Sequence, residues 1–221
     1  ELDLNKTTKK DGLITLKCLG KNKNIKELII KYKNIIKISY NCFQNLTNLN
    51  YINLSNNPLG KISKKFKCIG LLKVLKLNSA LIETIPSFLK DFKYLEELHL
   101  ENNKIEYVPS FIQYFKSLKL LNLSLNIIDK LPIEIGLIKN LEHLYIDKNE
   151  FSEIPTSMCY LENLKSLKLE WFEFLDPALS SEQADIKILN SLKDYLNEKL
   201  LSSIMYIDLQ SFIIILSQNL E

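Results

Sequence analysis

The sequence is organised by a motif that returns every 23 residues. Residues 95–109 read L-x-x-L-x-L-x-x-N-x-I-x-x-V-P, and the same frame recurs at residues 118–132 and 141–155. Seven frames, numbered here as repeats one to seven, start at Ile25, Leu49, Leu72, Leu95, Leu118, Leu141 and Leu164. A fixed period of this length is typical of arrays in which each unit stacks on its neighbours. The motif therefore predicts a solenoid.

Each repeat begins with a short segment that has strand periodicity. In repeat four, Leu98 and Leu100 are expected to point inward, because alternate residues of a strand face opposite sides. Such strands stack into a parallel sheet with a spacing of roughly 4.8 Å. The ninth residue of the repeat is Asn57, Asn103, Asn126 or Asn149 in repeats two, four, five and six. We expect these side chains to bond the backbone of adjacent turns. Looser stacking is expected where Lys33, Ala80 and Phe172 take their place.

About ten residues remain in each repeat for the outer side of the array. This length suffices for an irregular turn or a short helix. Pro86, Pro109, Pro132 and Pro155 precede this part and are expected to help end the preceding turn, because proline lacks a backbone donor. Cys42 falls in the same apolar column as Phe66 and Leu89, which predicts a small buried hydrophobic side chain.

The pattern resembles the leucine-rich repeat family in its intracellular 23-residue form, which occurs in Scribble-type scaffolds, Ras-suppressor-like proteins and Roco-kinase repeat domains. The resemblance covers about residues 2–176. It implies an α/β solenoid: a curved horseshoe with a parallel sheet on its concave side, convex turns or short helices, and capped ends. Residues 1–176 are assigned to the solenoid, with seven repeats and a truncated one in front.

Both ends of the array carry a prediction. Residues 177–221 are assigned to a C-terminal helical cap, since residues 181–201 have helical apolar spacing after a possible N-cap serine. Trp171 either closes the core under this cap or adds to the concave face. At the other end, Leu2 and Leu4 fit strand positions and leave an open edge, so residues upstream of Glu1 are expected.

Composition narrows the class and the compartment. The chain is 46% hydrophobic and 25% charged, as in ordinary soluble proteins, and no apolar run approaches the roughly 18 residues of a membrane span. The four cysteines form no C-x-x-C pair, which favours reduced thiols and a cytoplasmic location. No cofactor, metal or catalytic residue is predicted.

The concave face is the predicted partner-binding surface. Aromatic and apolar side chains are expected there between charged ones, as in an interface with anchors and a charged rim. Scattered exposed apolar residues are the plain alternative. The predicted partner-binding residues are Tyr51, Val74, Lys76, Glu97, His99, Glu101, Leu120, Asn122, His143, Tyr145, Asp147 and Lys168.

His99 lies near the middle of this surface, and the charges beside it suggest a raised pKa. Glu97 and Glu101 flank it in the sequence, and a nearby carboxylate favours the protonated imidazole. A metal site shared with His143 is disfavoured, because the two histidines would stand two strands, roughly 10 Å, apart.

Charge is distributed unevenly along the chain. Residues 1–80 hold 16 Lys against 4 acidic residues, giving +12, whereas residues 81–174 hold 10 Lys against 15, giving −5. The cluster Lys61, Lys64, Lys65 and Lys67 lies on the convex side of repeat two. It is either a basic flank for acidic lipid, nucleic acid or an acidic partner, or a solvated outer face. Among these partners, we expect an acidic one. Nucleic acid is disfavoured, because lysines alone give no base readout.

These features predict a non-catalytic protein–protein interaction module that binds a partner protein on its concave face, as a scaffold in signalling. The alternative is a regulatory repeat domain of a larger signalling enzyme: a kinase, a GTPase or a phosphatase regulator. A third hypothesis, a fragment of a secreted or surface receptor, would predict a signal sequence upstream and paired cysteines.

Overall fold

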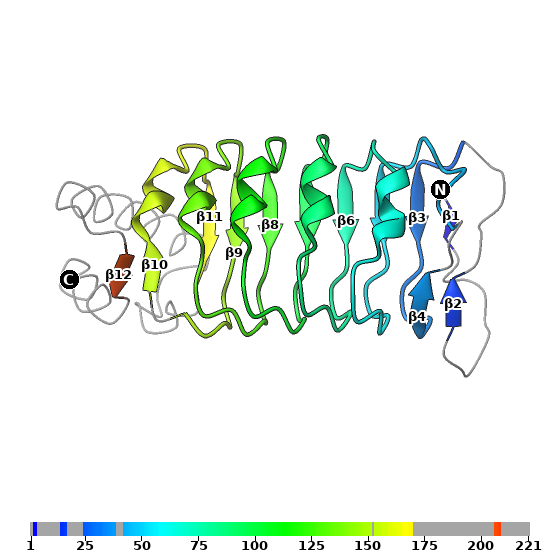
Figure 1. Cartoon of the computed structure of the whole chain (residues 1–221), viewed down its shortest axis with the longest axis horizontal. Coiled ribbons are helices and arrows are strands. Elements are labelled where there is room, and N and C mark those ends of the chain that lie inside the picture. The colour runs from blue at the N-terminus through cyan, green and yellow to red at the C-terminus, as the bar shows by residue number, and fades with distance from the viewer. Residues whose placement is uncertain are drawn as a thin grey trace, which may run out of the picture.

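The repeats stack side by side into an elongated solenoid (Figure 1). The computed structural model describes residues 2–3, 14–16, 24–38, 42–151, 153–169 and 206–208. One face is a parallel eight-stranded sheet in the order β1-β3-β5-β6-β7-β8-β9-β11. Its strands are β1 (Leu2–Asp3), β3 (Glu27–Ile29), β5 (Tyr51–Asn53), β6 (Val74–Lys76), β7 (Glu97–His99), β8 (Leu120–Asn122), β9 (His143–Tyr145) and β11 (Ser166–Lys168).

Each repeat supplies one strand, and the strands pair without slippage. Leu98 lies opposite Leu75 on one side and Leu121 on the other, and all three side chains are fully buried. A one-residue shift would turn this leucine column out of the core, so the repeat length and the register specify each other. Burying each leucine contributes roughly 1.5–3 kcal/mol, which a single repeat cannot obtain alone.

The side opposite the sheet carries short 3-10 helices. They are η2 (Lys64–Cys68), η3 (Ser87–Asp91), η4 (Ser110–Tyr114), η5 (Ile133–Leu137) and η6 (Thr156–Tyr160). The repeat prolines stand immediately before η3 to η6, with extended backbone. In η3 to η5 the proline carbonyl accepts the first helical hydrogen bond, as from the Leu89 amide to the Pro86 carbonyl at 3.1 Å. The expected turn or short helix is thus confirmed. Cys42 is buried as predicted, with 1% of its surface exposed.

A pairing that the sequence did not predict runs along the rim between the sheet and the helices. We call this part, the eleventh to fifteenth residues of each repeat, the lower rim, as it lies below the helices in Figure 1. In repeat one, β4 (Ile35–Ile38) pairs in parallel with β2 (Ile14–Leu16). In repeat six, β10 (Glu153–Pro155) pairs antiparallel with β12 (Tyr206–Asp208). The lower rim of repeat one thus pairs with the truncated repeat in front of it, and that of repeat six accepts an extended segment from outside the repeats.

The asparagine ladder forms as predicted. The Asn103 Oδ1 accepts hydrogen bonds from the Ala80 and Ile82 amides, at 3.0 and 2.9 Å, and its Nδ2 donates to the Leu77 and Leu100 carbonyls. Asn57, Asn126 and Asn149 make equivalent bonds. Each asparagine therefore links its own repeat to the preceding one, in a region where the backbone bends away from the sheet.

The missing asparagines change the turn and leave the strand register intact. The eighth residue of repeats one to six always has a left-handed φ, between 53° and 60°. In repeats one and three, where Lys33 and Ala80 replace the asparagine, the tenth residue is left-handed as well. At the Ala80 gap the Leu59 amide turns to the Asn57 carbonyl, 2.7 Å away. Two of the three sites thus differ from the other repeats in their turn geometry, and looser stacking stays a prediction.

Several predictions concern residues outside the described part of the chain. These are Leu4, Trp171, Phe172 and the helix over residues 181–201. The boundary at residue 176 and the C-terminal helical cap over residues 177–221 therefore stay predictions; β12 is the one described element of that region.

Candidate functional site: the concave sheet

The strands place the predicted site residues in aligned rows. Tyr51, Val74, Glu97, Leu120 and His143 lie in register in one row, since each is the first residue of its strand. Lys76, His99, Asn122, Tyr145 and Lys168 form the second row, each as the last residue of its strand. Glu101 and Asp147 follow two residues after the second row. The sequence therefore predicted the arrangement of this face correctly.

A lysine lies over a tyrosine ring on either side of the centre of this face. The Lys76 Nζ lies 5.7 Å from the Tyr51 ring centroid, and the Lys168 Nζ lies 4.8 Å from the Tyr145 ring centroid. A cation over an aromatic face stabilises both side chains by about 0.5–1 kcal/mol at an exposed site. The rings are therefore held in place before a partner arrives.

Three carboxylates accompany these pairs: Glu97 and Glu101 lie between them in repeat four, and Asp147 follows Tyr145 in repeat six. The Glu97 Oε2 is 2.9 Å from the His99 Nε2 and 4.0 Å from the Lys76 Nζ. Glu101 accepts hydrogen bonds from the Asn78 and Asn122 amides, at 3.4 and 3.2 Å, and Asp147 accepts one from the Ser124 hydroxyl. The donors to Glu101 and Asp147 are neutral side chains, so these hydrogen bonds orient the two carboxylates without cancelling their charge.

The pKa prediction for His99 is wrong. Burial lowers the pKa of His99, and this outweighs the Glu97 hydrogen bond, which raises it; the Lys76 charge lowers it further. Only 14% of the His99 side chain is exposed, so desolvation of the imidazolium dominates over the flanking carboxylates. His99 is therefore a neutral hydrogen-bonding group at pH 7.

The exposure of this face is lower than the sequence suggested. Most of the predicted residues are half-buried, Lys168 is exposed, and Asn122 is buried, with 9% exposure. Asn122 was expected to be open to a partner, but its amide is held by Glu101 and its Oδ1 accepts the Ser124 amide, at 3.0 Å. Asn122 thus contributes to the shape of the surface through Glu101.

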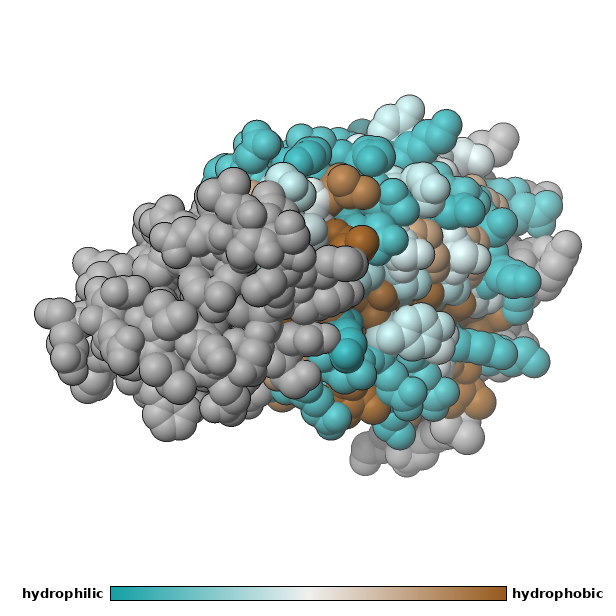
Figure 2. All heavy atoms as spheres, turned by 60° about the vertical axis from the view of Figure 1, so that its left-hand side comes forward, coloured by the Kyte–Doolittle hydropathy of each residue, from teal (hydrophilic) through white to brown (hydrophobic). Residues whose placement is uncertain are grey.

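A column of exposed large hydrophobic side chains lies elsewhere, and the sequence analysis missed it. Tyr114, Leu137 and Tyr160 occupy the twentieth position of repeats four, five and six, on the helical side, with exposures of 52%, 42% and 42%. The repeat frame contained the signal, because the twentieth position is hydrophobic in three consecutive repeats although it is outside the inward-facing positions. In the view of Figure 2, hydrophobic areas are small and separated by hydrophilic ones.

The described residues offer little for catalysis or metal binding. Among them, no group of three or more His, Cys, Asp or Glu side chains is placed to hold a metal ion. His99 and His143 lie on strands separated by β8 and in different rows. Burial raises the pKa of the Cys68 and Cys159 thiols, which disfavours the nucleophilic thiolate. No helix in the described part is long and apolar enough to cross a membrane.

The repeat geometry and the family matches agree on the class of protein. Residues 23–82 and 140–161 match two leucine rich repeat families. Together with the repeat geometry, these matches identify the repeats of this chain as leucine-rich repeats. Proteins of this kind are typically non-catalytic interaction modules. No curated protein sequence matches the chain significantly.

Solved structures extend the comparison to most of the solenoid. A leucine-rich repeat protein of Leptospira interrogans is similar over 66% of this chain and 37% of its own, with 29% identity and a TM-score of 0.59. The plant peptide hormone receptor RGFR1, in complex with RGF2, is similar over 65% of this chain and 23% of its own, with 22% identity and a TM-score of 0.52.

A third structure shows the same fold. The repeat ectodomain of the Arabidopsis thaliana receptor kinase GASSHO1/SCHENGEN3, in complex with CASPARIAN STRIP INTEGRITY FACTOR 2, is similar over 65% of this chain and 20% of its own, with 21% identity and a TM-score of 0.51. The chain thus spans well under half the length of all three proteins.

Proposed function

We propose that this chain is a non-catalytic interaction module that holds a partner protein on its concave sheet. The observation that carries the proposal is the presence of two lysine–tyrosine pairs and three oriented carboxylates on one face. Aromatic anchors with a charged surround are what protein interfaces use. Two of the plant receptors with this fold were solved in complex with a ligand, which supports a binding role for such an array.

The charge of this face indicates the chemistry of the partner. Glu101 and Asp147 are bonded by neutral amide and hydroxyl donors, so their negative charge is left to be met by a binding partner. The bound segment should therefore present a basic side chain between two groups that contact Tyr51 and Tyr145. Lys76 and Lys168 are themselves positively charged, so further basic side chains of the partner are disfavoured beside them.

Repeat six provides a matched test of the face. On the concave sheet, the Lys168 Nζ lies 4.8 Å from the Tyr145 ring centroid. On the helical side, the Lys139 Nζ lies 5.1 Å from the Tyr160 ring centroid. The two tyrosines therefore have the same local chemistry on opposite faces. The chain and its Tyr145→Ala and Tyr160→Ala variants would be used as bait in crosslinking capture from cells, and each captured partner would then be purified and titrated.

Tyr145→Ala should weaken binding of the purified partner by at least about tenfold, as expected for a central aromatic anchor. Tyr160→Ala should leave affinity unchanged, and circular dichroism should show both variants folded. The reverse pattern, with loss on Tyr160→Ala alone, would place the interface on the helical side. Equal affinity for all three proteins would disprove the concave-face proposal.

A further inference from the structure

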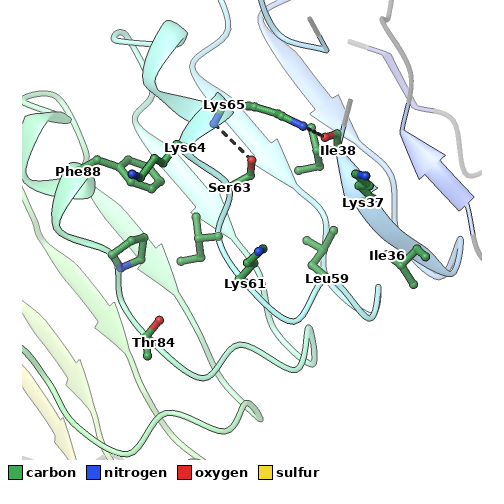
Figure 3. Close-up of a pocket in the computed structure, with 12 residues that line it drawn as sticks. Ile36, Lys37, Ile38, Leu59, Lys61, Ser63, Lys64, Lys65, Thr84 and Phe88 are labelled. Carbon is green, nitrogen blue, oxygen red and sulfur yellow. Dashed lines mark hydrogen bonds between the residues drawn. The ribbon is translucent and has the colours of Figure 1, made fainter. Parts of the chain in front are cut away.

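A half-enclosed cavity opens at the lower rim of repeats one to three (Figure 3). Its volume is about 500 Å³, within the range of sites that bind small molecules or a few side chains. Leu59, Ile62 and Phe88 give it an apolar floor, and Lys37, Lys61 and Lys64 line it with ammonium groups. It lies outside the concave sheet and uses none of the residues of the proposed partner site.

Repeat two creates this cavity by departing from the repeat pattern. Where repeats three and four have Pro86 and Phe88, or Pro109 and Phe111, repeat two has Ser63 and Lys65. Lys65 does not fill the space of the phenylalanine: its Nζ extends across to the Ile38 carbonyl of β4, as Figure 3 shows. The cavity is therefore bounded by β4 on one side and by the Phe88 ring on the other.

The charge around the cavity is of one sign. No acidic residue occurs between Glu27 and Glu83, and this stretch holds nine lysines. The Lys65 Nζ donates a hydrogen bond to the Ile38 carbonyl. Among the described residues, no ion pair is formed by the other three lysines of the cavity, Lys37, Lys61 and Lys64. Three unpaired cations around an apolar floor favour an occupant that carries both carboxylates and an apolar side chain.

The lower rim itself indicates that the occupant is an extended chain. At repeat one, β4 pairs with β2, and at repeat six, β10 pairs with β12. The same part of the repeat is thus extended and pairs with another strand in two places. At repeat one the partner is the truncated repeat in front, and at repeat six it is β12, a segment from outside the repeats, in antiparallel orientation. Addition of a strand to an open edge is a common mode of peptide recognition, in which pockets select the side chains.

We propose that the cavity at repeats one to three binds an extended acidic peptide segment of a partner, with an apolar side chain seated on Leu59, Ile62 and Phe88. The carboxylates of the peptide pair with Lys37, Lys61 and Lys64. This site is separate from the concave sheet, so the protein has two independent interaction surfaces. Its affinity falls with added salt, because its charge pairs are open to solvent.

The test uses a fluorescein-labelled peptide of alternating glutamate and leucine, measured by fluorescence anisotropy with the whole chain. Two matched peptides carry glutamine in place of glutamate, or serine in place of leucine. The protein variants are Lys61→Glu with Lys64→Glu, and, as a control of equal charge change, Lys93→Glu with Lys104→Glu, which lie away from the cavity. A third variant, Lys65→Phe, restores the aromatic side chain of repeats three and four and fills the space.

The acidic apolar peptide should bind, and both matched peptides should bind at least about tenfold more weakly, as expected when several charge pairs or the buried anchor are lost. The Lys61/Lys64 variant should lose binding by at least about tenfold, since each reversed surface charge is worth up to roughly fivefold. The control variant should change it by far less. Lys65→Phe should abolish binding while the melting temperature stays the same or rises.

Three results would overturn the proposal. If the glutamine peptide binds as tightly as the glutamate peptide, the site does not require acidic side chains. If the Lys93/Lys104 variant loses as much affinity as the Lys61/Lys64 variant, the effect comes from the net charge of the protein and not from the cavity. Binding to phosphatidylserine vesicles that is lost on Lys61→Glu with Lys64→Glu, without any binding of the peptide, would assign the cavity to an anionic membrane surface. Tyr145→Ala should leave peptide binding intact. A negative result for the cavity therefore leaves the concave-sheet proposal unaffected, and the reverse also holds.

Discussion

The eighth residue of each repeat shows how a single backbone angle constrains the sequence. Its φ is left-handed in repeats one to six, and the residues there are Tyr32, Asn56, Ser79, Asn102, Leu125 and Lys148. A left-handed φ costs an ordinary L-residue roughly 1–2 kcal/mol, whereas asparagine tolerates it through local hydrogen bonds. Repeats two and four have the favoured residue, and repeat five has leucine.

Leu125→Asn should therefore stabilise the protein. We expect the free energy of unfolding to rise by about 0.5–1 kcal/mol, because the strain at φ 57° is relieved and a 40% exposed leucine is removed. Urea denaturation followed by circular dichroism measures the change. Ile127→Asn is the matched control: Ile127 is 41% exposed and is not among the left-handed residues. Equal stabilisation by both substitutions would show that hydrophobicity, and not the backbone, is responsible.

The residue scale also shows what the sequence could predict. The inward leucines, the ladder asparagines and the rows of the concave face follow from position in the repeat alone. The His99 pKa and the burial of Asn122 do not, because they depend on how side chains from three neighbouring repeats enclose them. Two flanking glutamates are visible in the sequence, but the loss of solvent that outweighs them is not.

Among the elements, η5 and η6 are packed most tightly against each other, and Gly136 is the reason. A Cβ at Gly136 would overlap the Ser157 carbonyl oxygen, which is backbone and cannot rotate away. Ser157 in turn donates its hydroxyl to the Ile133 carbonyl, at 2.5 Å, which fixes the start of η6 against that of η5. The equivalent positions in repeats three and four, Lys90 and Gln113, carry a Cβ.

Gly136→Ala should destabilise the protein by about 1–3 kcal/mol, the usual cost of overpacking, although alanine is the better helix former. Thermal unfolding by calorimetry measures the loss. Gln113→Ala, at the same position of repeat four, removes no comparable contact and should change stability by less than about 0.5 kcal/mol. A melting temperature that is unchanged or raised by Gly136→Ala would mean that η6 moves away without cost.

The short elements set the limit of prediction from sequence. The position of each helix follows from the repeat frame, since about ten residues must connect the turn to the next strand. β2 lies in the truncated repeat in front of repeat one, so its pairing with β4 continues the stacking of neighbouring repeats. The pairing of β10 with β12 could not be predicted, because β12 lies outside the repeat frame. The cavity at repeats one to three was likewise visible only as a lysine cluster.

At the scale of the whole molecule, the array is held together by contacts between neighbours. The strand order follows the chain from β3 to β11, and β1 lies at the N-terminal end of the sheet. Stability in such an array is approximately a sum of repeat and interface terms, so opening should start at an end and spread inward. Backbone amides in central repeats should then exchange more slowly than those in repeat one.

Native-state hydrogen exchange tests this directly. The Leu123 amide bonds the Tyr145 carbonyl in the middle of the array, at 2.7 Å, and the Ile30 amide bonds the Asn53 carbonyl near its N-terminal end, at 2.8 Å. Because the bonds are alike, a slower exchange at Leu123 reports position in the array. Leu28→Ala removes a fully buried side chain from repeat one and should cost about 2–5 kcal/mol locally.

In that variant, exchange at Ile30 should accelerate by at least about tenfold, while exchange at Leu123 stays within about twofold, because repeat one can open without the centre. Leu121→Ala, an equally buried leucine in repeat five, should accelerate exchange at Leu123 instead. If Leu28→Ala accelerates both amides equally, the described repeats unfold as one cooperative unit. The two interaction surfaces proposed here would then be coupled through global stability, and a substitution in one could no longer be read as local to it.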